Sequence, residues 1–313
     1  LIDNENGGFY GEVTYDLKAN KKSEKGGIQT SRILWFFSAA YCATKNEEYK
    51  KAATNAYEFL RDKLIDEEFK GVYWMVDYLG NPIDTRKHIY CQSFAIYALS
   101  EYYKATKNEE ALNLAMELFE LIEGVGFNKE NSAYLEEFDR EWNITPNEML
   151  SENGVIAEIT TNTHLHVLEG YTTLYEITKN EAVREKLKNL IYTFYNKIYD
   201  KENHFLKIFF DGNWNTIIDV KSYGHDIEAS WLIDDKVLNL KDEAIEKMII
   251  DIAYNIKSQI QEDGSLINES ENGVKDYTRI WWVQVEAMVG YLNAYERTHD
   301  EEFLKIVNNL MKY

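Results

Sequence analysis

Two pairs of polar residues in this sequence have the types and the spacing needed for proton-transfer chemistry. Asn162 and His166 are four residues apart, and His225 and Glu228 are three residues apart, each pair near the start of a strongly apolar helical stretch. Side chains at these spacings lie on one face of a helix. The positive potential of a helix N-terminus favours a neutral imidazole, which can act as a base. The pattern therefore indicates general acid–base catalysis, with Glu228 placed to orient His225 or to stabilise its charge.

Equivalent positions of the other apolar stretches hold groups suited to binding a polar ligand. A carboxylate on an apolar helix is costly to bury unless it is paired, so its presence calls for an explanation. Aromatic rings beside arginine, amide and carboxylate groups are suited to stacking on sugar rings and bonding to their hydroxyls. These groups are Arg32, Tyr90 with Gln92, Trp281 with Trp282, and Glu286, with Phe9, Tyr10, Tyr73 and Trp74 in the preceding loops.

Each of these residues also has a structural explanation when it is taken alone. A single histidine on an apolar helix is more often a hydrogen-bonded core residue than a catalyst, and paired tryptophans often fill a core. His164 lies about 200° around the helix from His166, so His-Leu-His does not fit a metal motif. Three further histidines are interpreted as structural: His88 and His204 at the ends of loops, and His299 at the start of an outer helix.

A repeat in the sequence places all of these groups at one point of a common unit. Short turn segments rich in glycine or aromatic residues recur at roughly 60 to 70 residues, which is typical of stacked helical hairpins. They are Gly7-Gly8-Phe9-Tyr10, Gly71-Val72-Tyr73-Trp74, Ser132-Ala133-Tyr134-Leu135, Asn203-His204-Phe205-Leu206 and Asp263-Gly264-Ser265-Leu266. The functional candidates follow these segments, at the start of the next helix.

Apolar periodicity predicts a pair of helices between successive turn segments. The expected pairs are 27–44 with 46–64, 88–106 with 108–123, 156–178 with 180–199, 225–239 with 242–261, and 277–298 with 300–313. Short polar connections such as Thr106-Lys107-Asn108 join the helices within a pair, and aromatic runs such as 205–210 favour small strands between pairs. The first helix of each pair is apolar nearly all round and the second has one apolar stripe, which predicts inner and outer positions.

Inner and outer helices repeated in this way predict an all-α fold with two concentric rings. One further helix at each end would complete twelve helices, so we predict an (α/α)6 barrel lacking its first and last helices. Residues 1–313 are expected to form this single domain, incomplete at both ends, because two prolines and no low-complexity run leave little material for a linker. The starts of the inner helices should then converge on one mouth of the cavity.

Composition narrows the choice of partners and compartment. Thirty-four basic and 54 acidic residues give a net charge of −20, which disfavours nucleic acid and anionic membranes as partners. Two cysteines in apolar stretches, Cys42 and Cys91, exclude a disulfide framework and fit a reducing cytoplasm. No apolar run reaches the ~18 residues of a membrane span. A small-molecule ligand is therefore expected, and the oligomeric state is left open.

Long segments of the chain resemble the N-acylglucosamine 2-epimerase superfamily, in its cellobiose 2-epimerase branch. The matching segments occur in order and cover essentially the whole chain. They are Ser31-Arg32-Ile33-Leu34-Trp35-Phe36, Ser151-Glu152-Asn153-Gly154, Asn162-Thr163-His164-Leu165-His166-Val167-Leu168-Glu169, Ser222-Tyr223-Gly224-His225-Asp226-Ile227-Glu228-Ala229-Ser230-Trp231-Leu232 and Arg279-Ile280-Trp281-Trp282-Val283-Gln284-Val285-Glu286.

The resemblance implies an (α/α)6 barrel without metal or organic cofactor. The implied reaction is reversible epimerisation at C2 of the reducing-end glucose of cellobiose or related β-1,4-linked disaccharides. His225 would be a general acid/base, assisted by His166. The residues implied to bind the sugar or its reacting oxygens are Arg32, Tyr90, Asn162, Glu228, Trp282 and Glu286, and Trp281 is added as a stacking candidate. The family carries a second acid/base histidine in a last segment that lies beyond Tyr313.

Other functions stay open at this point. An aldose–ketose isomerase or an N-acylglucosamine 2-epimerase would use the same enediolate chemistry. An (α/α)6 glycoside hydrolase would need two opposed carboxylates, for which Glu228 and Glu286 are the candidates, but it would leave the histidines without a task. A non-catalytic sugar-binding scaffold is the alternative outside enzymes.

Overall fold

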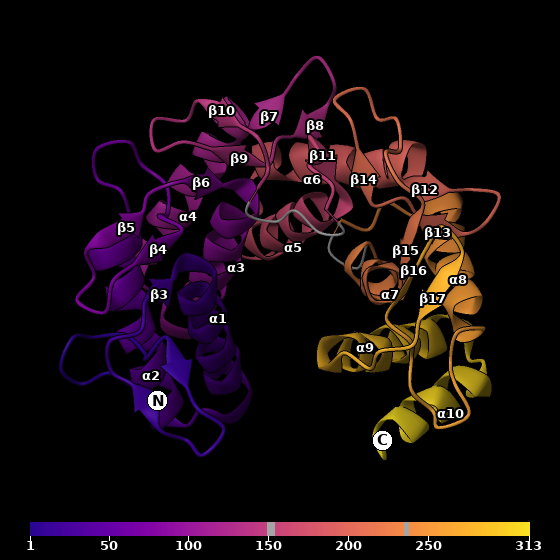
Figure 1. Cartoon of the computed structure of the whole chain (residues 1–313), viewed down its shortest axis with the longest axis horizontal. Helices are drawn as coiled ribbons and strands as arrows, with labels where there is room; N and C mark the ends of the chain where they lie inside the picture. Colours follow the sequence, from indigo (N-terminus) through magenta and orange to yellow (C-terminus); the bar gives the residue numbers. More distant parts are fainter. Residues whose placement is uncertain (149–153, 235–237) are drawn as a thin grey trace. The chain divides into compact units, whose positions relative to one another are not determined.

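The computed structural model describes residues 1–148, 154–234 and 238–313 (Figure 1). Helices dominate these residues, and the strands between them are short. The α-helices are α1 (Gly27–Thr44), α2 (Glu47–Phe59), α3 (Ile89–Thr106), α4 (Glu109–Leu121), α5 (Thr161–Thr178), α6 (Glu181–Thr193), α7 (Tyr223–Leu232), α8 (Glu243–Lys257), α9 (Trp281–Thr298) and α10 (Glu301–Leu310). Single π-helical turns extend α2, α4 and α6, namely η1 (Leu60–Leu64), η2 (Ile122–Gly126) and η3 (Phe194–Ile198).

The strands form small antiparallel sheets in the connections that precede each pair of helices. Three-stranded sheets have the orders β3-β4-β5, β10-β9-β6 and β15-β16-β17, and two-stranded ones pair β1 with β2, β7 with β8, β11 with β14, and β12 with β13. The strands are β1 (Glu12–Val13), β2 (Ala19–Asn20), β3 (Lys25–Gly26), β4 (Met75–Val76), β5 (Pro82–Asp84), β6 (Lys87–His88), β7 (Phe127–Asn128), β8 (Ala133–Tyr134), β9 (Glu137–Phe138), β10 (Ile144–Thr145), β11 (Ile159–Thr160), β12 (Tyr199–Asp200), β13 (Phe205–Leu206), β14 (Phe209–Phe210), β15 (Val220–Ser222), β16 (Glu269–Glu271) and β17 (Val274–Asp276).

The predicted helical pairs and the strands at 205–210 are confirmed, and the differences lie at helix ends. Helices α5 and α9 begin at Thr161 and Trp281, four to five residues later than the sequence predicts. Ile159–Thr160 pairs with β14 instead, and Asp276 accepts a bond from the backbone N–H of Thr278 in a local turn. Helix α7 begins two residues early and ends at Leu232 rather than at residue 239. Strand pairing before α5 and a side-chain turn before α9 thus replaced the first helical turn that apolar periodicity predicted for each.

Contacts divide the chain into two compact units, which are described separately. Unit 1 is Leu1–Ser151 with Glu169–Val183, and unit 2 is Glu152–Leu168 with Arg184–Tyr313. In unit 1, α1 packs against α2 and α3, and α3 packs against α4. In unit 2, α7 packs against α8 and α9, and α9 packs against α10. The expectation that residues 1–313 form one domain stays a prediction.

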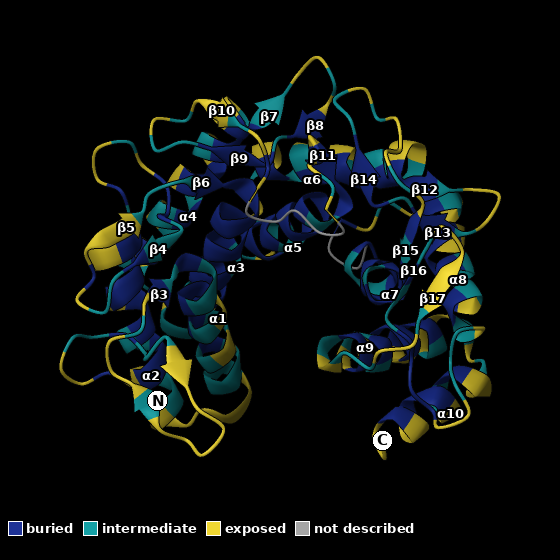
Figure 2. Cartoon of the chain, viewed as in Figure 1, coloured by how far each residue is buried: buried dark blue, intermediate teal, exposed yellow. Residues whose placement is uncertain are grey.

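The difference between the two helices of a pair is clear in unit 1. Helix α3 is buried along nearly its whole length, from Ile89 to Tyr102, apart from Tyr97 (Figure 2). Helix α4 instead buries one stripe, which consists of Ala111, Ala115, Leu118 and Phe119. This difference agrees with the predicted inner and outer roles, because only a helix covered on all sides can be apolar all round.

The connections within pairs use one repeated chemical device. The Thr106 hydroxyl donates to the carbonyl of Tyr102 and accepts from the N–H of Asn108, while Lys107 ends α3 with a left-handed φ of 61°. The Asn108 side chain then caps α4 by accepting from the N–H of Ala111. The same roles recur at 44–46, 178–180 and 298–300. His299 is the left-handed C-cap of α9, and Asp300 caps α10, which corrects the expectation that His299 starts that helix.

A second repeated contact ties the start of a helix to the turn segment before it. The Gln92 amide accepts from the N–H of Val72 and donates to its carbonyl, and Gln284 does the same with Leu266. In α7 the equivalent position is Asp226, which accepts from the N–H of Leu206. Gln92 was grouped with the functional candidates in the sequence, but the structure shows that its amide holds a loop.

Cysteine and membrane expectations can be checked directly. Cys42 and Cys91 are both free thiols, and Cys91 is fully buried, where burial raises its pKa to about 12. Across the part of the chain that the structure describes, every helix is too short or too polar to cross a membrane.

Candidate active site

A strand-to-helix junction in unit 2 positions the central histidine. Strand β15 pairs with β16 in a register that sets Ser222 opposite Glu269, and the N–H of Tyr223 donates to the carbonyl of Asn268 at 3.2 Å. Helix α7 begins directly after the strand, so His225 lies in its first turn. Backbone hydrogen bonds at this junction therefore fix the position of the residue that carries the imidazole.

The His225 ring is held by a hydroxyl on one side and packs on an indole. Its Nδ1 atom lies 2.7 Å from the Ser222 hydroxyl. The centroid of its ring lies 5.1 Å from that of Trp282, with an angle of 53° between the planes. Gly224 permits this packing, because a Cβ atom there would lie 2.5 Å from the Trp282 ring. The close approach of α7 and α9 at glycine thus brings the two side chains together.

The electrostatic surroundings of His225 keep its imidazole neutral. Burial, and to a lesser extent the nearby His166, lower its pKa to about 4. His166 comes from α5 and is itself buried. The neutral state agrees with the expectation from sequence, although the physical causes are burial and a second histidine rather than the helix terminus alone. A neutral imidazole can accept a proton at ordinary pH.

Further polar candidates of unit 2 lie on the same helices as this histidine pair or on α9. Glu228 lies one turn further along α7 and is buried. Glu286, on α9, accepts a hydrogen bond from the Trp231 indole N–H at 2.9 Å. The Asn162 amide oxygen is buried and has no hydrogen-bond partner in the described structure. The Trp281 side chain is 73% exposed, in contrast to Trp282.

The other candidates form an arginine group in unit 1, consisting of Arg32, Tyr90 and Phe94. The Arg32 guanidinium donates to the Tyr90 hydroxyl at 3.0 Å and lies 4.4 Å above the centre of the Phe94 ring. These contacts hold a permanent cation in a defined direction while leaving the side chain exposed to solvent.

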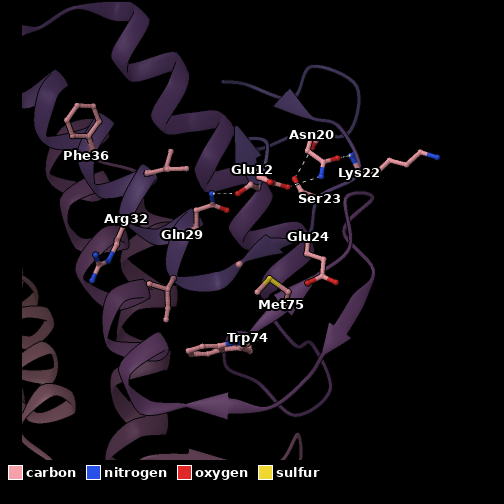
Figure 3. A pocket seen from close by; sticks show the side chains of 14 residues that line it. Glu12, Asn20, Lys22, Ser23, Glu24, Gln29, Arg32, Phe36, Trp74 and Met75 are labelled. Carbon is pink, nitrogen blue, oxygen red and sulfur yellow. Dashed lines mark hydrogen bonds between the residues drawn. The ribbon is translucent and has the colours of Figure 1, made fainter. Parts of the chain in front are cut away.

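A pocket of about 1060 Å³ adjoins this arginine (Figure 3). Arg32, Phe36 and Gln29 line it from α1, and Trp74 lines it from the turn segment that follows η1. Aromatic walls with a few polar groups are typical of small-molecule sites, and the volume is at the upper end of the usual range. The pocket thus combines a cation with surfaces on which a sugar ring can stack.

The histidines interpreted as structural have structural contacts. Nδ1 of His88 accepts from the N–H of Tyr90 and caps α3, and its Nε2 lies 3.1 Å from the Asn147 side chain. Nδ1 of His164 lies 2.8 Å from the carbonyl of Thr160, in the core beside Trp214. His164 is fully buried.

The structure thus groups the candidates in two sets. His166, His225 and Trp282 lie together in unit 2, while Arg32 and Tyr90 lie together in unit 1. The prediction that both sets line one cavity stays a prediction. Three residues of the motif at 151–154, namely Ser151, Glu152 and Asn153, lie outside the described residues.

Sequence reasoning assigned no role to three residues that contact the candidates. Ser222 precedes His225 by three residues, and this helical spacing was a usable signal. The contacts of Phe94 with Arg32 and of Trp231 with Glu286 join separate helices, so spacing along the chain carried no sign of them.

Comparison with known proteins identifies the family of this chain. The family model of N-acylglucosamine 2-epimerase matches residues 8–313. A cellobiose 2-epimerase of Dictyoglomus turgidum is 46% identical over 100% of this chain and 81% of its own length. One from Ruminococcus albus is 47% identical over 97% of this chain and 79% of its own. The solved cellobiose 2-epimerase of Bacillus thermoamylovorans superposes with a TM-score of 0.98 at 58% identity, covering 100% of this chain and 81% of that one.

More distant solved structures share the fold. A D-mannose isomerase has a TM-score of 0.84 at 22% identity, and a family 76 α-mannanase of Bacteroides thetaiotaomicron has 0.62 at 15%. Together with the epimerases, these neighbours confirm the predicted class, an all-α fold of the (α/α)6 barrel type.

These matches define the protein as an isomerase-class enzyme with an all-α fold. The chain belongs to the N-acylglucosamine 2-epimerase family, and within it the chain is similar to cellobiose 2-epimerases.

Proposed function

We propose that this enzyme epimerises C2 of the reducing-end glucose of cellobiose or a similar β-1,4-linked disaccharide. The observation that carries the proposal is a neutral imidazole, His225, packed against Trp282 and close to His166, in a chain similar to cellobiose 2-epimerases over its full length. Removing a proton from carbon requires a base that is unprotonated at working pH, and His225 meets this requirement.

The C2 proton of a sugar becomes acidic only after the ring opens and C1 becomes an aldehyde. His166 is proposed to move the proton between O5 and O1 in that opening step. His225 then removes the C2 proton through Nε2, which leaves a cis-enediolate whose negative charge spreads over O1 and O2. Return of a proton to the opposite face of C2 converts the reducing-end glucose unit into a mannose unit. The resemblance assigns that step to a second acid/base histidine.

Arg32 is the proposed stabiliser of the enediolate. Its bonds to Tyr90 and its stacking on Phe94 fix the guanidinium before reaction, so that little reorganisation is needed as charge develops. A fixed donor of this kind contributes about 3 to 4 kcal/mol to a transition state in comparable enzymes. Glu228 is proposed to stabilise the imidazolium that forms on His225.

The remaining candidates are proposed to hold the sugar. Trp282 and Trp281 offer stacking surfaces, and three side chains offer bonds to hydroxyls: Tyr90, Asn162 and Glu286. The buried, unpartnered oxygen of Asn162 supports this role, because an unsatisfied acceptor gains most from a ligand donor. The aromatic pocket beside Arg32 supports a disaccharide rather than a single small acid or amine.

Exchange with heavy water tests the proposed reaction directly. Incubation of the protein with cellobiose, and separately with its C2 epimer, should place deuterium at C2, detected by NMR and mass spectrometry. The number of reducing ends should stay constant, whereas a hydrolase would double it. Full retention of protium at C2 in both sugars would reject the proposal.

Replacement of the proposed base should remove this exchange. We expect His225→Gln to slow deuterium incorporation by more than about 100-fold, the usual contribution of a general base, while the circular dichroism spectrum and urea midpoint stay close to those of the parent. The matched control is His204→Gln, since the His204 side chain is 40% exposed and its ring contacts the hydroxyl of Tyr199, which directly follows η3. Exchange in His225→Gln at a tenth of the parent rate or more would exclude His225 as the base.

A further inference from the structure

Ser222 occupies the N-cap of α7 but does not cap it. Helices α2, α4 and α8 have Asn46, Asn108 and Asp242 at this position, and each side chain accepts from a backbone N–H of the first turn. A serine normally does the same. The Ser222 side chain makes no such bond, and its hydroxyl lies 2.7 Å from Nδ1 of His225. The helix thus forgoes a stabilising cap in favour of a contact with the imidazole.

The hydroxyl is held in place by its backbone. Ser222 is the last residue of β15, pairs with Glu269 of β16, and is 6% exposed. The next residue, Tyr223, is bonded through its N–H to Asn268. A side chain with a single rotatable bond on such a support has little freedom to move, so the orientation of the His225 ring follows from that of the strand.

The contact can also decide which ring nitrogen carries the proton. A neutral imidazole has one N–H, and its position is set by the hydrogen bond that the ring makes. A hydroxyl can donate or accept a hydrogen bond. Because Nδ1 of His225 faces Ser222, the lone pair that removes the C2 proton must lie on Nε2. We propose that Ser222 is a positioning residue that accepts a hydrogen bond from Nδ1–H of His225 and so keeps the Nε2 lone pair available for the C2 proton.

This inference deepens the proposed function and rests on it. It also explains why a serine suits this position better than a carboxylate. A carboxylate bonded to Nδ1 would stabilise the imidazolium and raise the pKa of His225. An uncharged acceptor fixes the tautomer while the base stays neutral.

The test combines a tautomer measurement with the exchange rate. Protein labelled with ¹⁵N at histidine is compared as the parent, Ser222→Ala, Ser222→Thr and Ser230→Ala, and the His225 signal is assigned by its loss in His225→Gln. Ser230 is the matched control, since its hydroxyl is buried on the same helix and donates to the carbonyl of Ile227. Urea unfolding of each variant shows whether it is folded.

In the parent, Ser222→Thr and Ser230→Ala, we expect proton-bearing Nδ1 and unprotonated Nε2 at neutral pH. Ser222→Ala should show a mixture of tautomers and a fall of about tenfold in the maximal C2 exchange rate, with little change in the sugar concentration at half-saturation. Recovery of the tautomer and of the exchange rate in Ser222→Thr would show that the hydrogen bond to the hydroxyl matters rather than packing alone, because threonine supplies the same acceptor.

Two results would overturn the inference: a parent protein with the proton on Nε2, or a Ser222→Ala variant with an unchanged tautomer. A parent that shows the expected tautomer but never exchanges C2 would reject the proposed reaction alone, and the assignment of Ser222 as the partner that fixes the ring would then stand on the NMR data.

Discussion

At the scale of single residues, His225 and His164 show that burial alone does not identify a base. Each lies in the first turn of a helix, and burial lowers the pKa of each to about 4. The Nδ1 atom of His164 faces the Thr160 carbonyl, and the ring is fully enclosed. His225 instead meets a hydroxyl and keeps part of its surface exposed. The difference that matters for catalysis lies in the contacts of each ring.

The lowered pKa of His225 predicts where activity is lost in acid. A base works only when unprotonated, so kcat/KM should fall as the pH drops through about 4, rather than through the ordinary histidine value near 6.5. The measurement is the initial rate of C2 exchange between pH 3.5 and 8, with folding monitored by circular dichroism at each point. An acidic limb centred near 6.5 would contradict the assignment of His225 as a base shielded from water.

The contact between His225 and Trp282 depends on the absence of a side chain at residue 224. In Gly224→Ala the new Cβ would lie within 2.5 Å of the Trp282 ring, so the indole must move away from the imidazole. We expect a destabilisation of about 1 to 3 kcal/mol, as for other overpacked sites, and slower C2 exchange. Gly124→Ala is the control, because a Cβ there meets no atom within 4 Å. Unchanged stability and exchange in Gly224→Ala would show that the close packing has no role.

At the scale of elements, the turn segments and the helices that follow them are joined by one repeated contact with one variation. Gln92 and Gln284 bond both the N–H and the carbonyl of a turn residue. Asp226 bonds the N–H of Leu206, its second oxygen has no partner in the described structure, and burial raises its pKa to about 8. A protonated carboxyl carries one donor and one acceptor, as the glutamine amide does, so a neutral Asp226 fits the same role.

The raised pKa of Asp226 predicts a pH-dependent stability. Between pH 3.8 and about 8 the unfolded chain releases this proton while the folded protein keeps it. Stability should therefore fall as the pH rises through this window, by at most about 1.4 kcal/mol per pH unit, and level off above it. Asp226→Asn keeps an acceptor and a donor but cannot ionise.

The corresponding measurement is urea unfolding at several pH values. Asp226→Asn should lose the downward slope and become more stable than the parent near pH 8. Ser230→Ala, which removes another buried polar group of α7, should keep the slope of the parent. Parallel pH profiles for the parent and Asp226→Asn would show that Asp226 is ionised in the folded protein.

At the scale of the whole molecule, residues with a proposed role occur in both compact units. The arginine group belongs to unit 1, and the histidine pair with Trp282 belongs to unit 2. A net charge of −20 gives the chain a field that repels anions, so a fixed cation such as Arg32 is a notable feature. An uncharged disaccharide is compatible with that field, and the enediolate formed from it requires local positive charge.

The proposed role of Arg32 can be tested with a conservative substitution. Arg32→Lys keeps the charge but loses the planar stacking on Phe94 and the directed bond to Tyr90. We expect C2 exchange to slow by about 100-fold, in line with the loss of a preorganised donor, with circular dichroism unchanged. Arg61→Lys, at a surface ion pair with Glu110, is the control. Normal exchange in Arg32→Lys would exclude the arginine group from the reaction.

Much of the fold could be predicted because its signals are local. Apolar periodicity found all five helical pairs, and the threonine–lysine–asparagine connections were visible as short polar breaks. The starts of α5 and α9 were misjudged because pairing of residues 159–160 with β14 and a turn at Asp276 compete with the first helical turn. Such competition involves partners distant in sequence or bonds of a single side chain, which a periodic pattern does not contain.

The sequence by itself determined the family, the all-α class and the types of group available for chemistry, because these depend on residue identity and spacing along one helix. Only the tertiary structure decided that Gln92 holds a loop, that Ser222 meets His225, and that Trp282 packs on the imidazole at Gly224. The physical reason is that hydrogen-bond geometry and the degree of burial arise when separate elements pack together. A residue's type fixes what its side chain can do, and the neighbours brought by folding fix which of those abilities it uses.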